Sequence, residues 1–350
     1  KKYWKLNFHF PILPMLEHDE LYYLMKFLIF LFLSLFLSRV LSGHEGHTFE
    51  FMKSGFIYND NGIVKYVDNI EYKKGKLFNS TILKDYKITT PDKIIILIYN
   101  HGMSANKEKI CNWHNGVVQI SKLTGHKIGD KEVKVFMNCE GMRVGGKRSF
   151  SKKKLMPLEE FVGDKPFIEN ATYFNRKQKT VELINKFISE GINPKNIFTS
   201  GQSWGGWNSL RIAAFNSELL NSSIAFEPGC CDPKKKQKPG SKVAEEFKYF
   251  SYNLKSAKEI NALVFSSFAD SFENPESLSF LKDIEGIKMV ELPGFENGKK
   301  IIKIHGKICK WDTHDQNNEN ITDGHYLLFS TCFDPYIEVI KEYMQSRLLN

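Results

Sequence analysis

One serine in this sequence stands in a setting suited to nucleophilic catalysis. Ser203 lies in the segment Gly201-Gln202-Ser203-Trp204-Gly205, which fits the pattern G-x-S-x-G. A short apolar stretch that predicts a strand precedes the segment, and a stretch that predicts a helix follows it. A strand that turns this sharply into a helix needs glycine at Gly201 and Gly205, because larger side chains would collide in the turn. The pattern therefore predicts that Ser203 projects above the turn as a nucleophile.

A histidine and an acid further along the chain could activate that serine. A serine hydroxyl is a weak nucleophile near neutral pH, so a histidine must take its proton and an acid must orient the histidine. His325 lies in Asp323-Gly324-His325-Tyr326, shortly before a predicted C-terminal helix. Asp270 directly follows the strand predicted at Ala262 to Ser267. We expect His325 to be the general base and Asp270 the residue that orients it.

Other residues compete for the same two roles. Glu227 and Glu273 are the alternative acids, and His305 and His314 are the alternative bases. None of the four combines a position directly after a predicted strand with the flanking residues that favour Asp270 and His325. They rank below the first choice and stay open at this point.

The order serine, acid, histidine resembles the catalytic triad of the α/β-hydrolase superfamily, with Gly201 to Gly205 as its nucleophile elbow. The resemblance extends from about residue 91 to the C-terminus, and its single-domain outline is similar to the dienelactone-hydrolase and secreted-esterase branches. It implies that the backbone N–H groups of Met103 and Trp204 form the oxyanion hole. The positive N-terminus of the helix after Ser203 would add to their effect.

The resemblance further implies hydrolysis of carboxylic esters through an acyl-enzyme intermediate, without a metal or an organic cofactor. The expected partner is a small-molecule or polymeric ester substrate. A serine peptidase of the prolyl-oligopeptidase type is the nearest alternative, and an acyltransferase with the same triad is another. A hydrolase-like binding protein without activity is an alternative from a different functional class.

The elements that must position these residues alternate between strand and helix. Ile94 to Tyr99 is a continuous apolar run typical of a strand buried on both faces in a parallel sheet. Further strands are predicted at Glu132 to Met137, Asn196 to Thr199, Ser223 to Phe226 and Ala262 to Ser267. Helical spacing is found at Phe174 to Glu190, Trp204 to Phe215 and Pro335 to Leu348. The fold class is therefore α/β, with a mainly parallel central sheet and helices on both faces.

Two regions complete the predicted sheet. Between residues 49 and 90, short β-like stretches and turn residues predict antiparallel N-terminal strands. Between residues 288 and 322, the segments KMVEL and KKIIKIHGKI compete for one further strand. Residues 44 to 350 are expected to form a single catalytic domain.

The N-terminal region predicts export. Residues 25–43 contain a lysine, an apolar run and then small residues, which is the organisation of a secretory signal peptide. Residues 1–24 begin without methionine and are expected to be an upstream, non-native extension. The apolar run is shorter than the about 20 residues that span a bilayer, so no stable membrane anchor is expected after cleavage. The predicted location is periplasmic or extracellular.

Export changes the interpretation of the six cysteines, because an oxidising compartment permits disulfides. The first pairs to consider are Cys111 with Cys139 and Cys309 with Cys332, which leaves the adjacent Cys230 and Cys231. Six cysteines allow about 15 connectivities, and the sequence does not choose among them.

The charge of the chain gives little reason to expect a nucleic-acid partner. The 49 Lys and Arg residues outnumber 40 Asp and Glu residues, for a net charge of +9. Most of the basic residues are lysines, which suit a solvated surface better than bidentate recognition of phosphate. The chain also has N-x-S/T sequons at Asn79, Asn170, Asn221 and Asn320, which matter only in a host that glycosylates.

Overall fold

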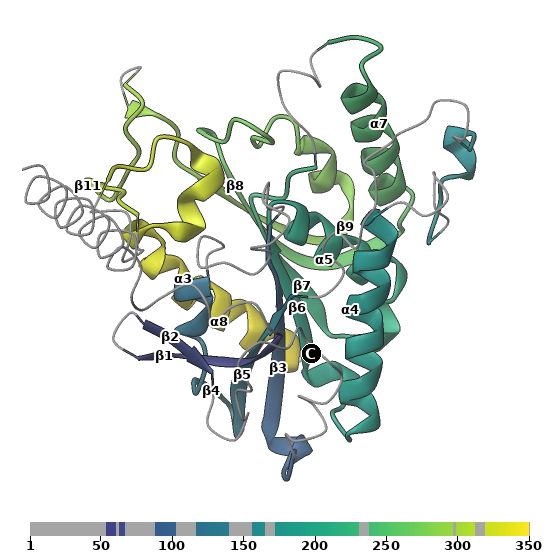
Figure 1. Ribbon diagram of the computed structural model, residues 1–350, viewed down its shortest axis with the longest axis vertical. Coiled ribbons are helices and arrows are strands. Elements are labelled where there is room, and N and C mark those ends of the chain that lie inside the picture. The colour runs from purple at the N-terminus through teal and green to yellow at the C-terminus, as the bar shows by residue number, and fades with distance from the viewer. Residues whose placement is uncertain are drawn as a thin grey trace, which may run out of the picture. The chain divides into compact units, whose positions relative to one another are not determined.

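A mainly parallel β-sheet forms the centre of the fold (Figure 1). The computed structural model describes residues 54–60, 63–66, 88–102, 117–139, 156–164, 172–230, 238–296, 299–311 and 319–349. All of them belong to one compact unit, Thr48–Asn350. The expected signal peptide, the preceding extension and the first residues of the expected domain lie outside the described residues.

The sheet has nine strands within the described residues, and eight of them follow the order β2-β1-β5-β3-β6-β7-β8-β9. Their bounds are β1 Gly55–Asp60, β2 Ile63–Tyr66, β3 Ile94–Asn100, β4 Lys127–Ile128, β5 Lys131–Asn138, β6 Ile197–Gln202, β7 Ser222–Phe226, β8 Glu259–Ser267 and β9 Glu285–Leu292. From β5 to β9 along this order all neighbours are parallel. Strand β1 pairs antiparallel with both β2 and β5, and β4 pairs antiparallel with β5. The predicted parallel sheet with antiparallel N-terminal strands is confirmed.

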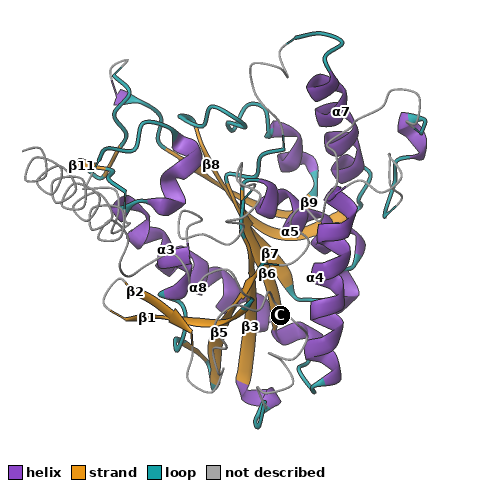
Figure 2. Cartoon of the chain, in the orientation of Figure 1, coloured by secondary structure: helices purple, strands orange, loops and turns teal. Residues whose placement is uncertain are grey.

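Helices cover both faces of the sheet, as predicted (Figure 2). Helices α3 (Val117–Ser121) and α8 (Asp334–Leu349) pack against one face, in a core that includes Ile120 and Ile340. Helices α4 (Thr172–Ser189), α5 (Trp204–Phe215) and α7 (Lys242–Lys255) lie on the other side. The helix α7 was not predicted from the sequence.

Strand β3 shows why the inner strands are apolar along their whole length. All seven of its residues are buried. Ile95 and Leu97 belong to the core on the α8 side, whereas Ile96 and Ile98 belong to the core beneath α4, because successive side chains point to opposite faces. Each such side chain contributes about 1.5–3 kcal/mol through its burial. A strand covered on both faces therefore needs apolar residues at every position.

Of the two segments between residues 288 and 322 that were candidates for a further strand, only one joins the central sheet. The segment KMVEL is the second half of β9 and joins the central sheet. The other segment forms a separate two-stranded hairpin from β10 (Lys303–Ile304) and β11 (Lys307–Ile308). The chain then continues into a 3-10 helix, η9 (Gly324–Phe329), and from there toward α8.

One predicted disulfide is confirmed. Cys309 and Cys332 are bonded, with a Cα–Cα distance of 5.2 Å, and the bond joins the hairpin region to the segment before α8. Cys139 takes part in a disulfide bond, and so does Cys230, each with a partner that the described residues do not identify. Cys111, the expected partner of Cys139, lies outside the described residues, and so does Cys231.

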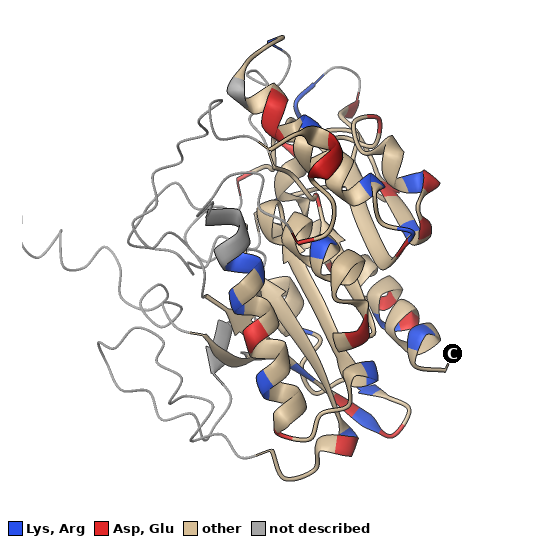
Figure 3. Cartoon of the chain, turned by 90° about the vertical axis from the view of Figure 1, so that its right-hand side faces the viewer, with Lys and Arg blue, Asp and Glu red and all other residues tan. Residues whose placement is uncertain are grey.

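The surface carries mixed charge. Figure 3 shows acidic and basic residues interspersed along the helices and loops of one face, with the strands between them largely uncharged. Within the parts of the chain that the structure describes, no helix is both long and apolar enough to cross a membrane.

Candidate active site

Ser203 lies on a strained turn between β6 and α5. Its backbone has φ 55° and ψ −123°, a region that residues with a side chain seldom adopt. A Cβ at Gly205 would lie 2.0 Å from the carbonyl oxygen of Asn100, and one at Gly201 would lie 2.4 Å from the backbone of Gly205. Both glycines are therefore required by the close approach of β3 to the turn. Ser203 therefore lies at a sharp strand-to-helix turn with glycine at both of the crowded positions.

The three residues expected to cooperate lie within hydrogen-bonding distance of one another. His325 Nε2 is 2.8 Å from Ser203 Oγ. His325 Nδ1 is 3.0 Å from Asp270 Oδ2 and 3.1 Å from Oδ1. The serine follows β6, the aspartate follows β8 and the histidine follows β9, so all three lie at the carboxyl edge of the parallel sheet. With the proton of the neutral imidazole on Nδ1, the ring donates to Asp270 and presents a lone pair to Ser203.

Asp270 is fixed by its own loop. Its Oδ1 accepts hydrogen bonds from the backbone N–H groups of Phe272 and Glu273, at 2.7 and 3.2 Å. The residue is 6% exposed, and the ring of Phe272 lies 4.3 Å from the His325 ring, between centroids. The backbone donors hold the Asp270 carboxylate in place, and the Phe272 ring covers the neighbouring imidazole.

The segment that carries His325 is held from three sides. Asp323 Oδ1 accepts from the His325 backbone N–H at 2.9 Å and from the Ser271 N–H at 3.1 Å. Gly324 N–H donates to Ala269 O at 2.9 Å, and Gln202 Nε2 donates to His325 O at 2.8 Å. The base is therefore tied to the acid's loop and to the elbow. Asp323 was not predicted to contribute, although an aspartate that precedes a helical turn is a usual capping residue.

Of the two expected oxyanion donors, Trp204 is among the described residues and Met103 is not. Trp204 is the first residue of α5, where backbone N–H groups have no partner within the helix. Met103 lies outside the described residues, directly after Gly102. The side chains of Trp204 and Trp207 are buried. They are 4% and 0% exposed and pack in the core with Phe250.

The imidazole of His325 is hydrogen-bonded to Asp270 and not to the carboxylate of either alternative acid. Glu227 is fully buried, and no described residue forms a hydrogen bond with its carboxyl oxygens. Burial raises the pKa of Glu227 well above its usual value, and the nearby carboxylates of Asp270 and Asp323 raise it further. Glu273 accepts a hydrogen bond from Ser277 Oγ at 2.8 Å. His305 is an exposed residue of the hairpin turn, and His314 lies outside the described residues.

A buried cation that the sequence did not reveal lies beside the elbow. Arg176 of α4 is 2% exposed and donates from Nη2 to the carbonyl oxygen of His101. Burial lowers the pKa of Arg176 to about 9, so it stays charged at neutral pH. His101 is also fully buried, with Nδ1 2.7 Å from Gly102 O. Burial, followed by the charge of Arg176, lowers the pKa of His101 well below its usual value.

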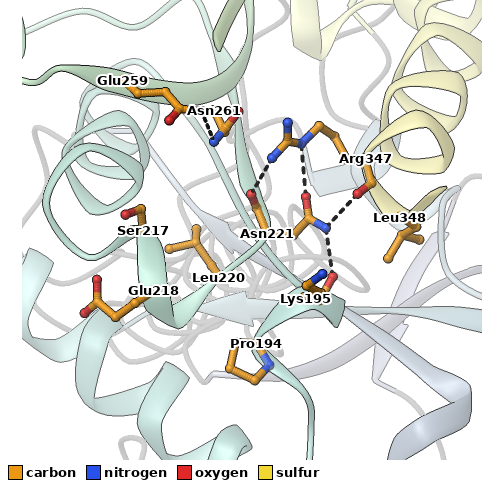
Figure 4. A pocket seen from close by; sticks show the side chains of 10 residues that line it. All are labelled: Pro194, Lys195, Ser217, Glu218, Leu220, Asn221, Glu259, Asn261, Arg347 and Leu348. Carbon is orange, nitrogen blue, oxygen red and sulfur yellow. Dashed lines mark hydrogen bonds between the residues drawn. The ribbon is translucent and has the colours of Figure 1, made fainter. Parts of the chain in front are cut away.

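A cavity of about 470 Å³ lies elsewhere, at the amino ends of β6, β7 and β8 (Figure 4). Lys195, Asn221 and Glu259 line it, together with Arg347 of α8. Because the triad lies at the carboxyl ends of the same strands, this cavity is separate from the candidate active site. Figure 4 shows the side chains of Asn221 and Arg347 joined across it by hydrogen bonds.

Comparisons with known proteins find similarity only among solved structures. No family model and no curated protein matches the chain. Est1E from Butyrivibrio proteoclasticus, solved with ferulic acid, has 14% identity and a TM-score of 0.42, with 74% of this chain and 92% of that chain covered. Acetyl xylan esterase 1 from Thermoanaerobacterium has 13% identity and a TM-score of 0.36, with 59% and 70% covered.

A third similar structure is a putative dipeptidyl aminopeptidase IV from Bacteroides ovatus, at 16% identity and a TM-score of 0.38. The alignment covers 57% of this chain but only 28% of that protein. All three belong to the α/β-hydrolase superfamily. The fold of this chain is mixed α/β, with a mainly parallel central sheet and helices on both faces. Within that fold, the elbow and the hydrogen bonds among Ser203, His325 and Asp270 are the features on which the functional argument rests.

Proposed function

We propose that the protein is a serine hydrolase that cleaves carboxylic esters. The observation that carries the proposal is the continuous chain of hydrogen bonds from Ser203 Oγ through His325 to Asp270, at 2.8 and 3.0 Å. This chain begins on a strained turn at the N-terminus of α5. A serine so placed, with a buried and oriented imidazole beside it, has the geometry required for activation as a nucleophile.

Acylation would begin with the transfer of the Ser203 Oγ proton to His325 Nε2 as Oγ attacks the ester carbonyl. The carbonyl oxygen becomes an oxyanion, which the Trp204 N–H and the N-terminus of α5 stabilise, with Met103 N–H as the expected second donor. The imidazolium is stabilised by the carboxylate of Asp270, which itself stays unprotonated. When the ester C–O bond breaks, the proton on Nε2 goes to the departing alcohol.

Deacylation repeats the same steps with water in place of the serine. Water donates a proton to His325 Nε2 and attacks the acyl carbonyl, and the proton then returns to Ser203 Oγ as the acid product leaves. No step needs a metal or an organic cofactor. The proposed substrate is a small-molecule or polymeric ester, because an alcohol leaves with less assistance from the acid than an amine does.

We also propose that the protein works in a periplasmic or extracellular compartment. The support is the predicted signal peptide at residues 25–43 together with the disulfide between Cys309 and Cys332. Disulfides persist in oxidising compartments and are rare in the cytosol. N-terminal sequencing of exported protein tests the proposal, which predicts a mature N-terminus close to residue 44 and is contradicted by recovery of Lys1.

The test of catalysis is the hydrolysis of p-nitrophenyl esters of increasing chain length by the wild type and by Ser203→Ala, Asp270→Asn and His325→Ala. Each substitution is expected to lower kcat by about 10³-fold or more, because each removes a member of a unit that acts together. The matched control is His305→Ala. It removes an exposed histidine of the β10–β11 turn and is expected to leave kcat unchanged.

A fluorophosphonate probe separates the alternatives. Labelling of Ser203 without turnover of any ester would overturn the esterase and favour a peptidase or an acyltransferase. Absence of both labelling and turnover would overturn the hydrolase altogether and favour a binding protein.

A further inference from the structure

Within the part of the chain that the structure describes, Arg176 is a buried charge without a carboxylate beside it. The residue is 2% exposed, and no described residue forms a hydrogen bond with its Nε or Nη1. Among the described residues no carboxylate forms an ion pair with it. A buried charge without a partner costs several kcal/mol in the folded state, so its presence calls for a reason other than stability.

The charge lies next to the loop that leads to the oxyanion site. Among the described residues, the guanidinium of Arg176 donates from Nη2 to the carbonyl oxygen of His101. The next residue, Gly102, packs against the nucleophile, since a Cβ built on it would lie 3.3 Å from the Cβ of Ser203. A Cβ on Gly205 would lie 2.7 Å from the same His101 oxygen, so this carbonyl also faces the first turn of α5.

The His101 carbonyl therefore brings a partial negative charge close to the place where an oxyanion would form. Left alone, that oxygen would oppose the developing charge and weaken the positive end of α5. A guanidinium that binds it cancels the opposing dipole and adds a full positive charge, in a region where little water screens it. The imidazole of His101 adds no competing charge, because burial and Arg176 lower its pKa.

We propose that Arg176 is a positioning residue for the oxyanion site, which holds the His101–Gly102 backbone and supplies a positive field that stabilises the tetrahedral intermediate. The inference rests on the proposed function, since it concerns the same reaction at Ser203. It goes beyond that function because it assigns a role to a charge that touches neither the substrate nor the triad.

Two substitutions separate the charge from the hydrogen bond. Arg176→Gln keeps an N–H donor within reach of His101 O and removes the charge, whereas Arg176→Lys keeps the charge. For a p-nitrophenyl ester, Arg176→Gln is expected to lower kcat by about 10- to 100-fold with KM nearly unchanged, somewhat less than the loss of a direct oxyanion donor. Arg176→Lys is expected to lose less than about 5-fold on the same scale.

Phenylboronic acid provides a readout that a purely structural role would not move. Addition of Ser203 Oγ to the boron gives a tetrahedral, negatively charged adduct that resembles the intermediate. The inhibition constant of phenylboronic acid is expected to rise in Arg176→Gln by the same factor by which kcat/KM falls. The control is Arg211→Gln in α5, which removes another buried guanidinium, one that donates to Asn253 Oδ1 at 2.9 Å. It is expected to lower stability without changing either value.

These measurements distinguish a failure of the proposed function from a failure of the role proposed for Arg176. If the wild type neither hydrolyses the ester nor labels with a fluorophosphonate, the proposed function fails first. If the wild type is active and Arg176→Gln matches it, or if kcat/KM falls while the affinity for phenylboronic acid does not, the role of Arg176 is overturned. Should Arg176→Gln not fold, Arg176→Met, which also removes the charge, replaces it under the same criterion, and unchanged or unequal values overturn the inference.

Discussion

Different kinds of contact position the nucleophile and the base in the candidate active site. Ser203 is positioned by its immediate neighbours, since Gly201 and Gly205 let β3 approach the turn and α5 begins at the next residue. His325 lies far from any strand of the central sheet in sequence. It depends on Asp323, on contacts with the loop of Asp270 and on a disulfide that closes its segment.

The position of the nucleophile is thus encoded by its neighbours in sequence, whereas the position of the base depends on the tertiary fold. Breaking the elbow should damage the whole protein, because the elbow lies within the central sheet. Breaking the base segment should damage mainly that segment, because its links are at the edge of the fold. Substitutions in the two regions test this contrast through their effects on the free energy of unfolding, and the largest loss is described first.

The largest effect is expected for Gly205→Ala. The added Cβ would lie 2.0 Å from the carbonyl oxygen of Asn100, and neither β3 nor α5 can retreat within the packed core. We expect a loss of more than about 4 kcal/mol in the free energy of unfolding, or no folded protein. Urea denaturation followed by circular dichroism measures it.

Gly125→Ala is the matched control for that substitution. Its added Cβ meets nothing within 4 Å, so only the strain of its φ of +82° remains, at about 1–2 kcal/mol. Equal losses in the two variants would contradict the steric account of the elbow.

The second effect is expected for the double variant Cys309→Ser/Cys332→Ser. The bond closes a loop with a sequence separation of 23, so its removal is expected to cost about 3 kcal/mol. Hydrogen exchange should accelerate in residues 319–333 while β3 and β6 keep their protection. Equal acceleration in β3 would show that the base segment and the central sheet unfold as one unit.

The third effect concerns Glu227, the buried acid that lies near the triad without joining it. Its raised pKa means that the folded state holds a proton that the unfolded chain releases above about pH 4.5. The unfolded state then binds fewer protons, so stability falls as pH rises through the range between the two pKa values, by up to about 1.4 kcal/mol per pH unit.

Glu227→Gln removes that dependence. We expect the variant to match the wild type near pH 4 and to become increasingly more stable toward pH 8, with kcat within about twofold of the wild type because Asp270 orients the base. Urea titrations at several pH values and ester hydrolysis provide the two measurements. A loss of kcat comparable to that of Asp270→Asn would instead make Glu227 the orienting acid.

The sequence predicted the parts of this protein that depend on local patterns. The apolar run at β3, the spacing in α8 and the glycines around Ser203 each express a constraint that acts within a few residues. Asp270 and His325 could be chosen only through the order of the triad, because nothing in their own segments shows that they meet. Their distances confirm that the chosen pair lies together, while catalysis by them stays a prediction.

Features that depend on tertiary packing could not be predicted from the sequence. Arg176 lies in a helix whose polar residues are typical of an exposed face, so its burial follows from how α4 packs against β3. The capping role of Asp323 was visible in principle as an aspartate two residues before His325, yet its second link, to Ser271, depends on the tertiary fold.

The cavity at the amino edge of the sheet has a consequence for how the protein is made. Asn221 is a sequon asparagine, but its Nδ2 donates to Lys195 O at 2.9 Å and to Arg347 O at 3.1 Å, a residue 126 positions later. The last turn of the chain thus closes over the very nitrogen that a glycosyltransferase would modify. An N-glycan is bulky, so glycosylation of Asn221 before α8 docks would place a sugar where Arg347 must lie. A host that does not attach N-glycans avoids this conflict between modification and folding.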